Sequence, residues 1–116
     1  MTIERIETSS RMSQVVAHDN TVYMAGIVAN KTAGQSVIKQ TEEILSIIDG
    51  YLAKAGTSKS KLLSATIYLT DMERFPEMNA IWDAWVSQGN TPARATVGVK
   101  LAGTQYNVEI MVIAAK

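Results

Sequence analysis

The sequence predicts an α+β domain with one mixed six-stranded sheet and two helices packed on one of its faces. Two stretches carry apolar residues at helical spacing, and six shorter stretches alternate in polarity or are rich in β-branched residues. Helices and strands alternate in the second half, and right-handed crossovers between parallel strands place both helices on one side. A chain of 116 residues is the usual size of one domain, so we expect a single domain at 1–116.

Three strands are predicted before the first helix. Residues 3–6 alternate apolar and charged side chains, as a short edge strand does. Residues 13–17 and 21–28 are rich in β-forming residues and are separated by a polar turn at 18–20, which predicts a hairpin. Gly26 lies inside the second strand of this hairpin, where glycine marks a bulge or a close backbone approach, which is either structural or lets a ligand reach the main chain.

The first helix is expected to start after Ser36, a favourable N-cap, and to run to about Lys54, before Gly56. Apolar residues and one threonine recur along it at helical spacing, which predicts a buried stripe. The members of this stripe are Val37, Thr41, Ile44, Leu45, Ile48 and Leu52.

The second helix is signalled by Asp71 and Pro76 and is expected to end near Ser87. Trp82 and Trp85 fall on its apolar stripe. An aromatic pair at this spacing is typical of a core, so we interpret the two rings as core residues rather than as a ligand platform.

The last three strands are predicted at 62–70, 94–101 and 105–114, and two of them carry an isolated charge. Alternate side chains share a face of a strand, so Arg94 lies opposite an apolar side of its strand, as does Glu109. If both apolar sides pack against the helices, Arg94 and Glu109 share the uncovered face of the sheet. Ionised groups are rarely found on core-like strands without partners, so this pair predicts a site.

The uncovered face is also expected to carry Leu62, Met111 and Ile113. A continuous apolar patch of this kind is unusual on a monomer, so we expect the face to pack against another copy of the chain. The site would then lie at a subunit interface. A plain interchain ion pair between Arg94 and Glu109, with no catalytic role, explains the same pattern.

Several function classes are excluded or unsupported by composition. The formal net charge is +0, which gives no field for non-specific binding of nucleic acid or anionic lipid. The chain has no cysteine and one histidine, His18 in the predicted turn, so thiolate catalysis, a serine triad and the common metal-ligand spacings are not expected. No glycine-rich phosphate loop, signal peptide or membrane-spanning stretch is recognisable, and the cytoplasm is the expected location.

What remains is an arginine that can grip a carboxylate through two hydrogen bonds and a glutamate that can orient or deprotonate a water. That pair suits the addition of water to a small electrophile that carries a carboxylate.

The sequence also resembles the RidA/YjgF family of reactive-intermediate deaminases, and the resemblance covers essentially the whole chain. It rests on the order of elements, on Gly26 and Asn79, and on the Thr91-Pro92-Ala93-Arg94 and Val108-Glu109-Ile110 segments. The short YoaB-like members are the most similar. The features shared with them are Arg11, Ser13, the segment Trp82-Asp83-Ala84-Trp85 and the ending Ile113-Ala114-Ala115.

The resemblance implies a chorismate-mutase-like fold, a homotrimer with three clefts between subunits, and cofactor-free hydrolysis of enamines or imines such as 2-aminoacrylate and 2-iminopropionate. It implies that Arg94 binds the substrate carboxylate, that Glu109 positions the attacking water, that Gly26 offers a backbone amide, and that the main chain at Thr96 contacts the substrate nitrogen. By the same resemblance Asn79 belongs to the substrate-binding residues.

Four positions depart from the family pattern. Met12 replaces a tyrosine of the cleft, Ala25 replaces a serine, Thr96 replaces a frequent cysteine, and Met111 replaces a second glutamate. Met12 and Ala25 make the expected pocket less polar, which favours bulkier or more apolar imino acids or broad specificity. The loss of polar groups is equally compatible with a regulatory module that binds a carboxylate without turnover. An endoribonuclease or translation inhibitor, labels also attached to the family, receives no support from the charge or from His18.

Overall fold

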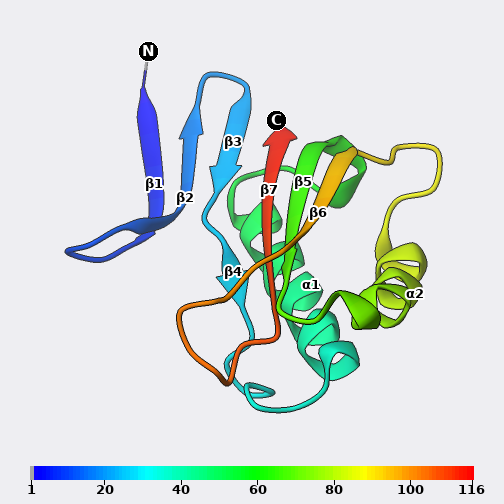
Figure 1. Cartoon of the computed structure of the whole chain (residues 1–116). Helices are drawn as coiled ribbons and strands as arrows, with labels where there is room; N and C mark the ends of the chain where they lie inside the picture. Colours follow the sequence, from blue (N-terminus) through cyan, green and yellow to red (C-terminus); the bar gives the residue numbers. More distant parts are fainter. Residues whose placement is uncertain (1) are drawn as a thin grey trace.

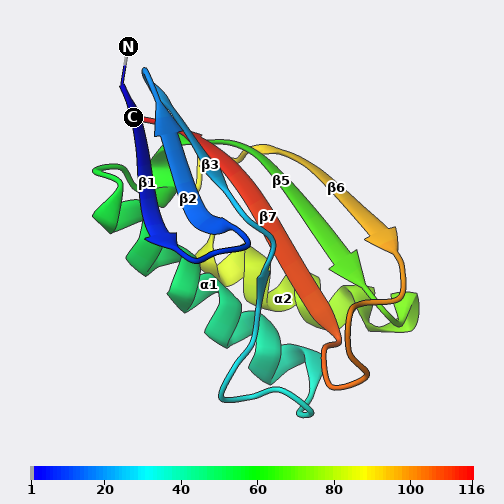
Figure 2. The same cartoon turned by 90° about the vertical axis from the view of Figure 1, so that its left-hand side faces the viewer.

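The computed structural model describes residues 2–116 and contains one sheet with two α-helices packed on it (Figure 1). Both helices lie on the same face of the sheet, as the side view makes clear (Figure 2). In chain order the elements are β1 (Ile3–Thr8), β2 (Ser13–His18), β3 (Thr21–Met24), β4 (Ile27–Val28), α1 (Val37–Lys54), the 3-10 turn η1 (Lys59–Lys61), β5 (Leu62–Leu69), the 3-10 turn η2 (Met72–Arg74), α2 (Phe75–Trp85), β6 (Ala93–Gly98) and β7 (Val108–Ala115).

The strands form a mixed sheet in the order β1-β2-β3-β7-β5-β6, with β4 also paired to β7. All pairs are antiparallel except β5 and β6, which are parallel and are joined through α2. The predicted mixed α+β sheet with two helices on one face is therefore confirmed. The second strand of the predicted hairpin is divided at Ala25 and Gly26, so the structure has seven strands rather than six.

Both helices begin and end where local signals predict, within a few residues. The side chain of Ser36 caps α1 by accepting a hydrogen bond of 3.2 Å from the amide of Lys39. Gly56 follows the helix with φ +81°, a conformation that glycine adopts without strain. The carboxylate of Asp71 caps η2, so α2 itself starts at Phe75. No helix within residues 2–116 is both long and apolar enough to cross a membrane.

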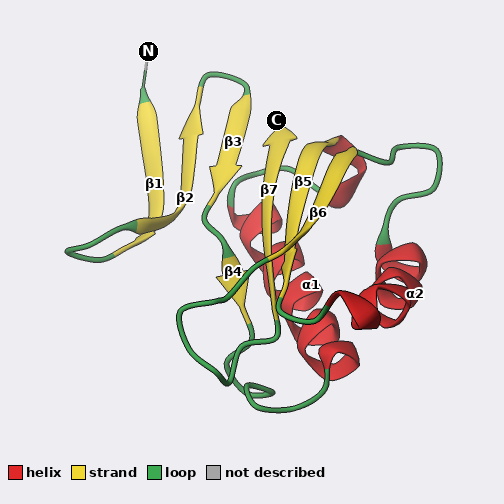
Figure 3. Ribbon diagram, in the orientation of Figure 1, coloured by secondary structure: helices red, strands yellow, loops and turns green. Residues whose placement is uncertain are grey.

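The boundaries of the last two strands differ more from the predicted ones than those of the helices do. β6 ends at Gly98 and β7 begins at Val108, because residues 99–107 form the long loop that joins the two strands (Figure 3). At the amino end β1 extends to Thr8, and β2 includes His18, which leaves Asp19 and Asn20 as the turn.

The core lies between the sheet and the helices. On β7 the buried residues are Val108, Ile110, Val112 and Ala114, as predicted, and Glu109, Met111 and Ile113 lie on the opposite, open face. The prediction for Leu62 is wrong. A bulge between Leu62 and Ser64 resets the alternation of β5, so Leu62 is 6% exposed in the core and Leu63 is 51% exposed.

The first turns of α1 hold two loops at one end of the sheet. The carboxylate of Glu43 accepts hydrogen bonds from the amides of residues 30, 31 and 32 and from the hydroxyl of Thr32, at 2.7–3.0 Å. Burial alone would raise the pKa of Glu43, but these hydrogen bonds lower it to about 2. Gln40, fully buried, donates to the carbonyls of Gln35 and Gln105 and accepts from the amide of Asn107 at 2.9 Å. The segments that lead out of β4 and into β7 are thereby fixed to the same helix.

Candidate active site

Glu109 lies on the open face at the second position of β7, an inner strand of the sheet. Its strand neighbours are Val28 on β4 and Tyr68 on β5, directly opposite it on either side. Side chains directly opposite in a sheet point to the same face, so a carboxylate stands here between an aliphatic and an aromatic side chain. Within residues 2–116 no ion pair or side-chain hydrogen bond involves Glu109. Burial raises the pKa of its carboxyl above the ordinary value of 4.5.

Gly26 leaves room for this carboxylate. A Cβ atom added at Gly26 would overlap Oε2 of Glu109 and would lie 2.8 Å from Cδ and 3.1 Å from Cγ, closer than ordinary contacts. The position also coincides with the break between β3 and β4, next to Ala25, whose amide donates to the carbonyl of Gln14 at 2.8 Å. The structure therefore brings Gly26, Ala25 and Glu109 together, and the glycine is explained by a close approach of the glutamate to the main chain.

The guanidinium of Arg94 lies against two aromatic rings. Its Cζ is 5.4 Å from the ring centroid of Trp82 and 5.9 Å from that of Phe75, and both rings belong to α2. Stacking uses the face of the guanidinium, and the N–H donors lie in its plane. No acidic side chain within residues 2–116 forms an ion pair with Arg94, so its donors are not committed to a carboxylate of its own chain.

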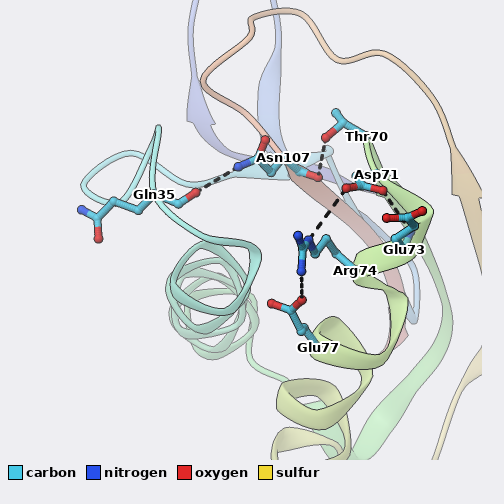
Figure 4. A network of polar contacts seen from close by, with 7 residues as sticks. All are labelled: Gln35, Thr70, Asp71, Glu73, Arg74, Glu77 and Asn107. Carbon is cyan, nitrogen blue, oxygen red and sulfur yellow. Dashed lines mark hydrogen bonds and ion pairs between the residues drawn. The ribbon is translucent and has the colours of Figure 1, made fainter.

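The pairing of Arg94 differs from that of Arg74, which directly precedes Phe75 at the start of α2. Arg74 donates to Glu77 at 2.7 Å and is 3.8 Å from Asp71, and the contact of Thr70 with Asn107 lies beside this group (Figure 4). Arg74 is thus held by acidic neighbours on its own chain. Arg94 is held by aromatic rings, an arrangement that leaves it able to receive an anion from outside the chain.

Arg94 and Glu109 lie on opposite faces of the sheet, contrary to the sequence-based expectation. In the parallel ladder Arg94 is paired with Ala65, which faces the helices and is 2% exposed. Glu109 is paired with Tyr68 on the open face. Strand alternation was right for β7 but assigned the wrong side of β6, because β6 is an edge strand whose Ala95 and Val97 face the open side while the rings of α2 cover Arg94.

Two of the remaining predicted residues lie on the elements that carry Arg94 and its aromatic neighbours. Thr96 lies two residues after Arg94 on the same face of β6, and Asn79 lies on α2 between Phe75 and Trp82 at helical spacing. The Oγ1 atom of Thr96 and the Oδ1 atom of Asn79 are buried without a hydrogen-bond partner in the part of the chain that the structure describes.

Met12 lies in the turn between β1 and β2 with an exposed side chain. Its main-chain carbonyl accepts from Ser9. No hydrogen bond joins this turn to Arg94 or Glu109 within residues 2–116, so the structure does not bring Met12 to either side chain through polar contacts.

Three residues near Arg94 were not assigned to the site from sequence: Met72, Phe75 and the ring of Trp82. Trp82 is 4% exposed, so the prediction of a core position is confirmed, but one side of the ring carries Arg94. The spacing of Phe75 and Trp82, seven residues apart on one helix face, is visible in the sequence. The spacing does not predict which strand residue contacts these rings, because that depends on the position of β6 relative to α2.

No group of three metal-binding side chains of His, Cys, Asp or Glu occurs within residues 2–116. The chemistry that the two regions offer is therefore that of an unpaired guanidinium and a carboxyl group with a raised pKa, which suits binding of a small carboxylate and proton transfer to or from water.

Comparison with known proteins gives one consistent family. The family model described as Endoribonuclease L-PSP matches residues 2–116. A RutC family protein of Haemophilus influenzae is 46% identical over 114 residues, covering 98% of each chain, and the RutC family protein YoaB of Escherichia coli is 45% identical over 115 residues, covering 99% of each. The crystal structure of a YjgF family protein from Neisseria meningitidis has a TM-score of 0.96 and 40% identity, covering 100% of this chain and 96% of that one. The chain therefore belongs to the RidA/YjgF family.

Proposed function

We propose that the protein is a hydrolytic deaminase of small reactive enamines and imines, related to 2-aminoacrylate and 2-iminopropionate, that yields a 2-keto acid and ammonia without a cofactor. The proposal is supported mainly by two ionisable groups that form no ion pair within residues 2–116. These are Arg94, which lies against aromatic rings, and Glu109, which lies against Gly26. Family membership supports the reaction class.

Arg94 is proposed to bind the substrate carboxylate. A guanidinium donates two parallel hydrogen bonds to a carboxylate, and such charge-assisted pairs are stronger than neutral ones. Since Phe75 and Trp82 lie 5.9 Å and 5.4 Å from its Cζ, Arg94 has few conformations to lose when the ligand arrives. The backbone of Gly26 and the main chain at Thr96 are proposed to supply further contacts, with Ala25, Met12 and Asn79 lining the pocket.

Glu109 is proposed to act on water. Its carboxylate accepts a proton as the water oxygen attacks the imine carbon, and the C=N double bond becomes a C–N single bond. The proton is returned to the nitrogen, which gives a carbinolamine with one hydroxyl and one amino group. Glu109 then accepts the proton of the new hydroxyl group and passes it to the amino nitrogen, and the C–N bond breaks as the carbonyl forms, which releases ammonia. In the single chain burial raises the pKa of Glu109, and a guanidinium brought against it by a second copy would lower that pKa again and favour the carboxylate that accepts the proton of water.

Because Arg94 and Glu109 lie on opposite faces of the sheet, a site that uses both is proposed to be built by two chains. Arg94 on the edge strand of one copy would be brought against Glu109 on the open face of a second copy, and repeating the contact around a three-fold axis gives a closed homotrimer with three equal clefts. The open face carries exposed apolar groups, Tyr23 and Val97 among them, that such an assembly would cover.

The activity is tested with imino acids made in situ by an L-amino-acid oxidase, by measuring keto-acid release with and without the protein. Arg94→Ala should raise KM about 10- to 100-fold, since a hydrogen bond to a charged group contributes about 1.5–3 kcal/mol. Glu109→Gln should lower kcat about 10²- to 10⁴-fold while leaving the binding of a keto acid nearly unchanged. An Arg94→Ala protein as active as wild type would refute the proposed roles.

Mixed oligomers test the contribution of two chains. Each single variant, Arg94→Ala or Glu109→Gln, lacks one half of every site. When the two are unfolded together at equal amounts and refolded, about one quarter of the sites in a cyclic assembly should combine an intact arginine with an intact glutamate. Activity should return to about that fraction of the wild-type value. If both residues of a site came from one chain, mixing would restore nothing.

A carboxylate-binding regulatory module is the second candidate, favoured by the apolar residues Met12 and Ala25 where the family pattern is polar. It predicts keto-acid binding in calorimetry with no acceleration of imine hydrolysis. It also predicts that Glu109→Gln changes no measured property except stability.

A further inference from the structure

Glu7 has a backbone conformation that its place in the chain does not explain. It lies in β1 with φ +54°, in the left-handed region, where the only other non-glycine residue within residues 2–116 is Asp19 at φ +55°. Asp19 belongs to the turn between β2 and β3, and aspartate tolerates this conformation. A glutamate inside a strand is strained there, and strain of this kind persists only where the surrounding structure maintains it, often for function.

The left-handed residue redirects the end of the hairpin formed by β1 and β2. The register between the two strands is the same before and after Glu7, so the chain bends there without a change of pairing. Figure 1 shows the connection between β1 and β2 directed away from both helices. Since β1 is an edge strand, this connection projects beyond the sheet of its own chain.

The connection is closed by its own hydrogen bonds. The hydroxyl of Ser9 accepts from the amides of Arg11 and Met12 at 3.3 and 3.2 Å, and the amide of Ser9 donates to the carbonyl of Met12 at 2.8 Å. The hydroxyls of Thr8 and Ser13 lie 2.9 Å apart across its base. Residues 9–12 therefore form one unit, and the bend in β1 sets the direction in which this unit points.

An ion pair joins the bend to α1. Nζ of Lys54, the last residue of the helix, lies 2.8 Å from Oε1 of Glu7 and 5.8 Å from the ring centroid of Tyr51. Within residues 2–116 no other hydrogen bond or ion pair connects β1 with α1. The two side chains are 49% and 55% exposed, and a pair this exposed contributes little to stability. Its main consequence is the position of the strand end.

We propose that Glu7 and Lys54 are positioning residues, whose ion pair directs residues 9–12 so that Met12 reaches the substrate pocket. The inference rests on the proposed function, in which Met12 lines that pocket. Because the connection projects away from its own helices, the pocket that it reaches is one shared with a neighbouring copy in the proposed assembly. Without the ion pair residues 9–12 sample other directions, which weakens substrate binding and leaves the chemical step unchanged.

The first experiment measures the order of the connection directly. The chain has no cysteine, so Met12→Cys gives a single attachment point for a thiol-reactive spin label. Glu7→Gln and Lys54→Met should each increase the mobility of the label in the electron paramagnetic resonance spectrum. Glu4→Gln is the matched control, because Glu4 is a similarly exposed residue of β1 that pairs with Lys116 at 3.6 Å, and it should leave the spectrum unchanged.

The second experiment measures imine hydrolysis by the same variants without the label. Glu7→Gln and Lys54→Met should each raise KM about 2- to 5-fold, the range that one exposed ion pair supports, with kcat and the urea midpoint unchanged. A double variant that reverses the pair, Glu7→Lys with Lys54→Glu, should restore most of the wild-type KM, which neither reversal alone does. A purely structural role predicts a lower urea midpoint instead of this split between KM and kcat.

The possible failures are distinguishable. If wild type accelerates no imine hydrolysis, the deaminase function is refuted, while the label and the binding of pyruvate in calorimetry still test the role of the ion pair. If hydrolysis occurs but neither variant changes the label or KM, the positioning role is refuted and the deaminase stands. A more mobile label with an unchanged KM would also overturn the inference, since the ion pair would then order the connection without serving the pocket.

Discussion

Gly26→Ala is expected to remove most of the activity while leaving the fold intact. The added Cβ would overlap Oε2 of Glu109 and lie 2.8 Å from its Cδ, whereas ordinary contacts between carbon atoms are about 3.5–4.0 Å. The carboxyl carbon must therefore move by at least about 0.7 Å, and the overlapping oxygen must move farther than that. Since the atoms in the way belong to the flexible end of a side chain, the glutamate rather than the backbone is expected to move.

The magnitude follows from the sensitivity of catalysis to position. A displacement of about 1 Å in a catalytic group costs about 10²-fold in rate. The stability cost is small. Alanine at a compatible position stabilises by about 0.4–1 kcal/mol through the unfolded chain, and a strained Glu109 rotamer costs about 0.5–1.5 kcal/mol. Gly26 has no left-handed φ, so the net change in the free energy of unfolding should stay within about 1 kcal/mol.

The assay pairs kcat/KM for imine hydrolysis with urea denaturation of the same sample. Gly50→Ala is the matched control, since Gly50 is an exposed position of α1 with no atom within 4 Å of an added Cβ. It should raise the free energy of unfolding by about 0.5–1 kcal/mol, as expected for glycine to alanine within a helix, and leave the activity unchanged. A Gly26→Ala protein that keeps more than half of the wild-type kcat/KM would refute the role assigned to the close approach of Glu109 to Gly26.

Three further outcomes are expected. Folding lowers the pKa of Glu43 to about 2 from 4.5, so its stabilisation is complete above pH 4.5 and lost as the pH falls through 2. After a discount for solvent screening, Glu43→Gln should cost about 2 kcal/mol in urea denaturation at pH 7 and roughly half as much at pH 3. A 2-keto acid that binds Arg94 should alter the tryptophan fluorescence, and the signal should survive Trp85→Phe but not Trp82→Phe, the variant that removes the ring under the guanidinium. Light scattering should give the mass of three chains for wild type and a lower mass for Tyr23→Glu on the open face, with Ile38→Glu on α1 as the unchanged control.

The helices and the hairpin could be predicted from sequence because their signals are local. The Ser36 cap, the spacing of the apolar stripe of α1 and the Asp19-Asn20 turn each lie within a few residues of the feature that they specify. The division of the hairpin strand at Gly26 was visible only as a choice between a bulge and a close approach. The structure supplies the reason, since the neighbour that requires the glycine is Glu109 from the other end of the chain.

The side occupied by Arg94 could not be predicted because alternation relates residues within one strand but does not orient the strand. For β7 the choice was clear, since one side carries four apolar residues, whereas the other carries three apolar residues and one glutamate. For β6 neither side carries a buried apolar residue, and the decisive contact of Arg94 is with Phe75 and Trp82 on another element. Leu62 shows the same limit at a bulge, where one extra residue inverts the pattern.

The placement of the two charges on opposite faces also makes the chemistry of the proposed site depend on assembly. In a single chain, burial beside Val28 and Tyr68 raises the pKa of Glu109, and no cation of the same chain pairs with it. A guanidinium brought within about 4–6 Å by a second copy would lower that pKa again, because it favours the ionised form. The carboxylate that water activation requires would then be present at lower pH in the oligomer than in the separated chain. Dilution below the assembly concentration should therefore reduce the activity of each chain in two ways, by separating Arg94 from Glu109 and by leaving a larger fraction of Glu109 protonated at mildly acidic pH.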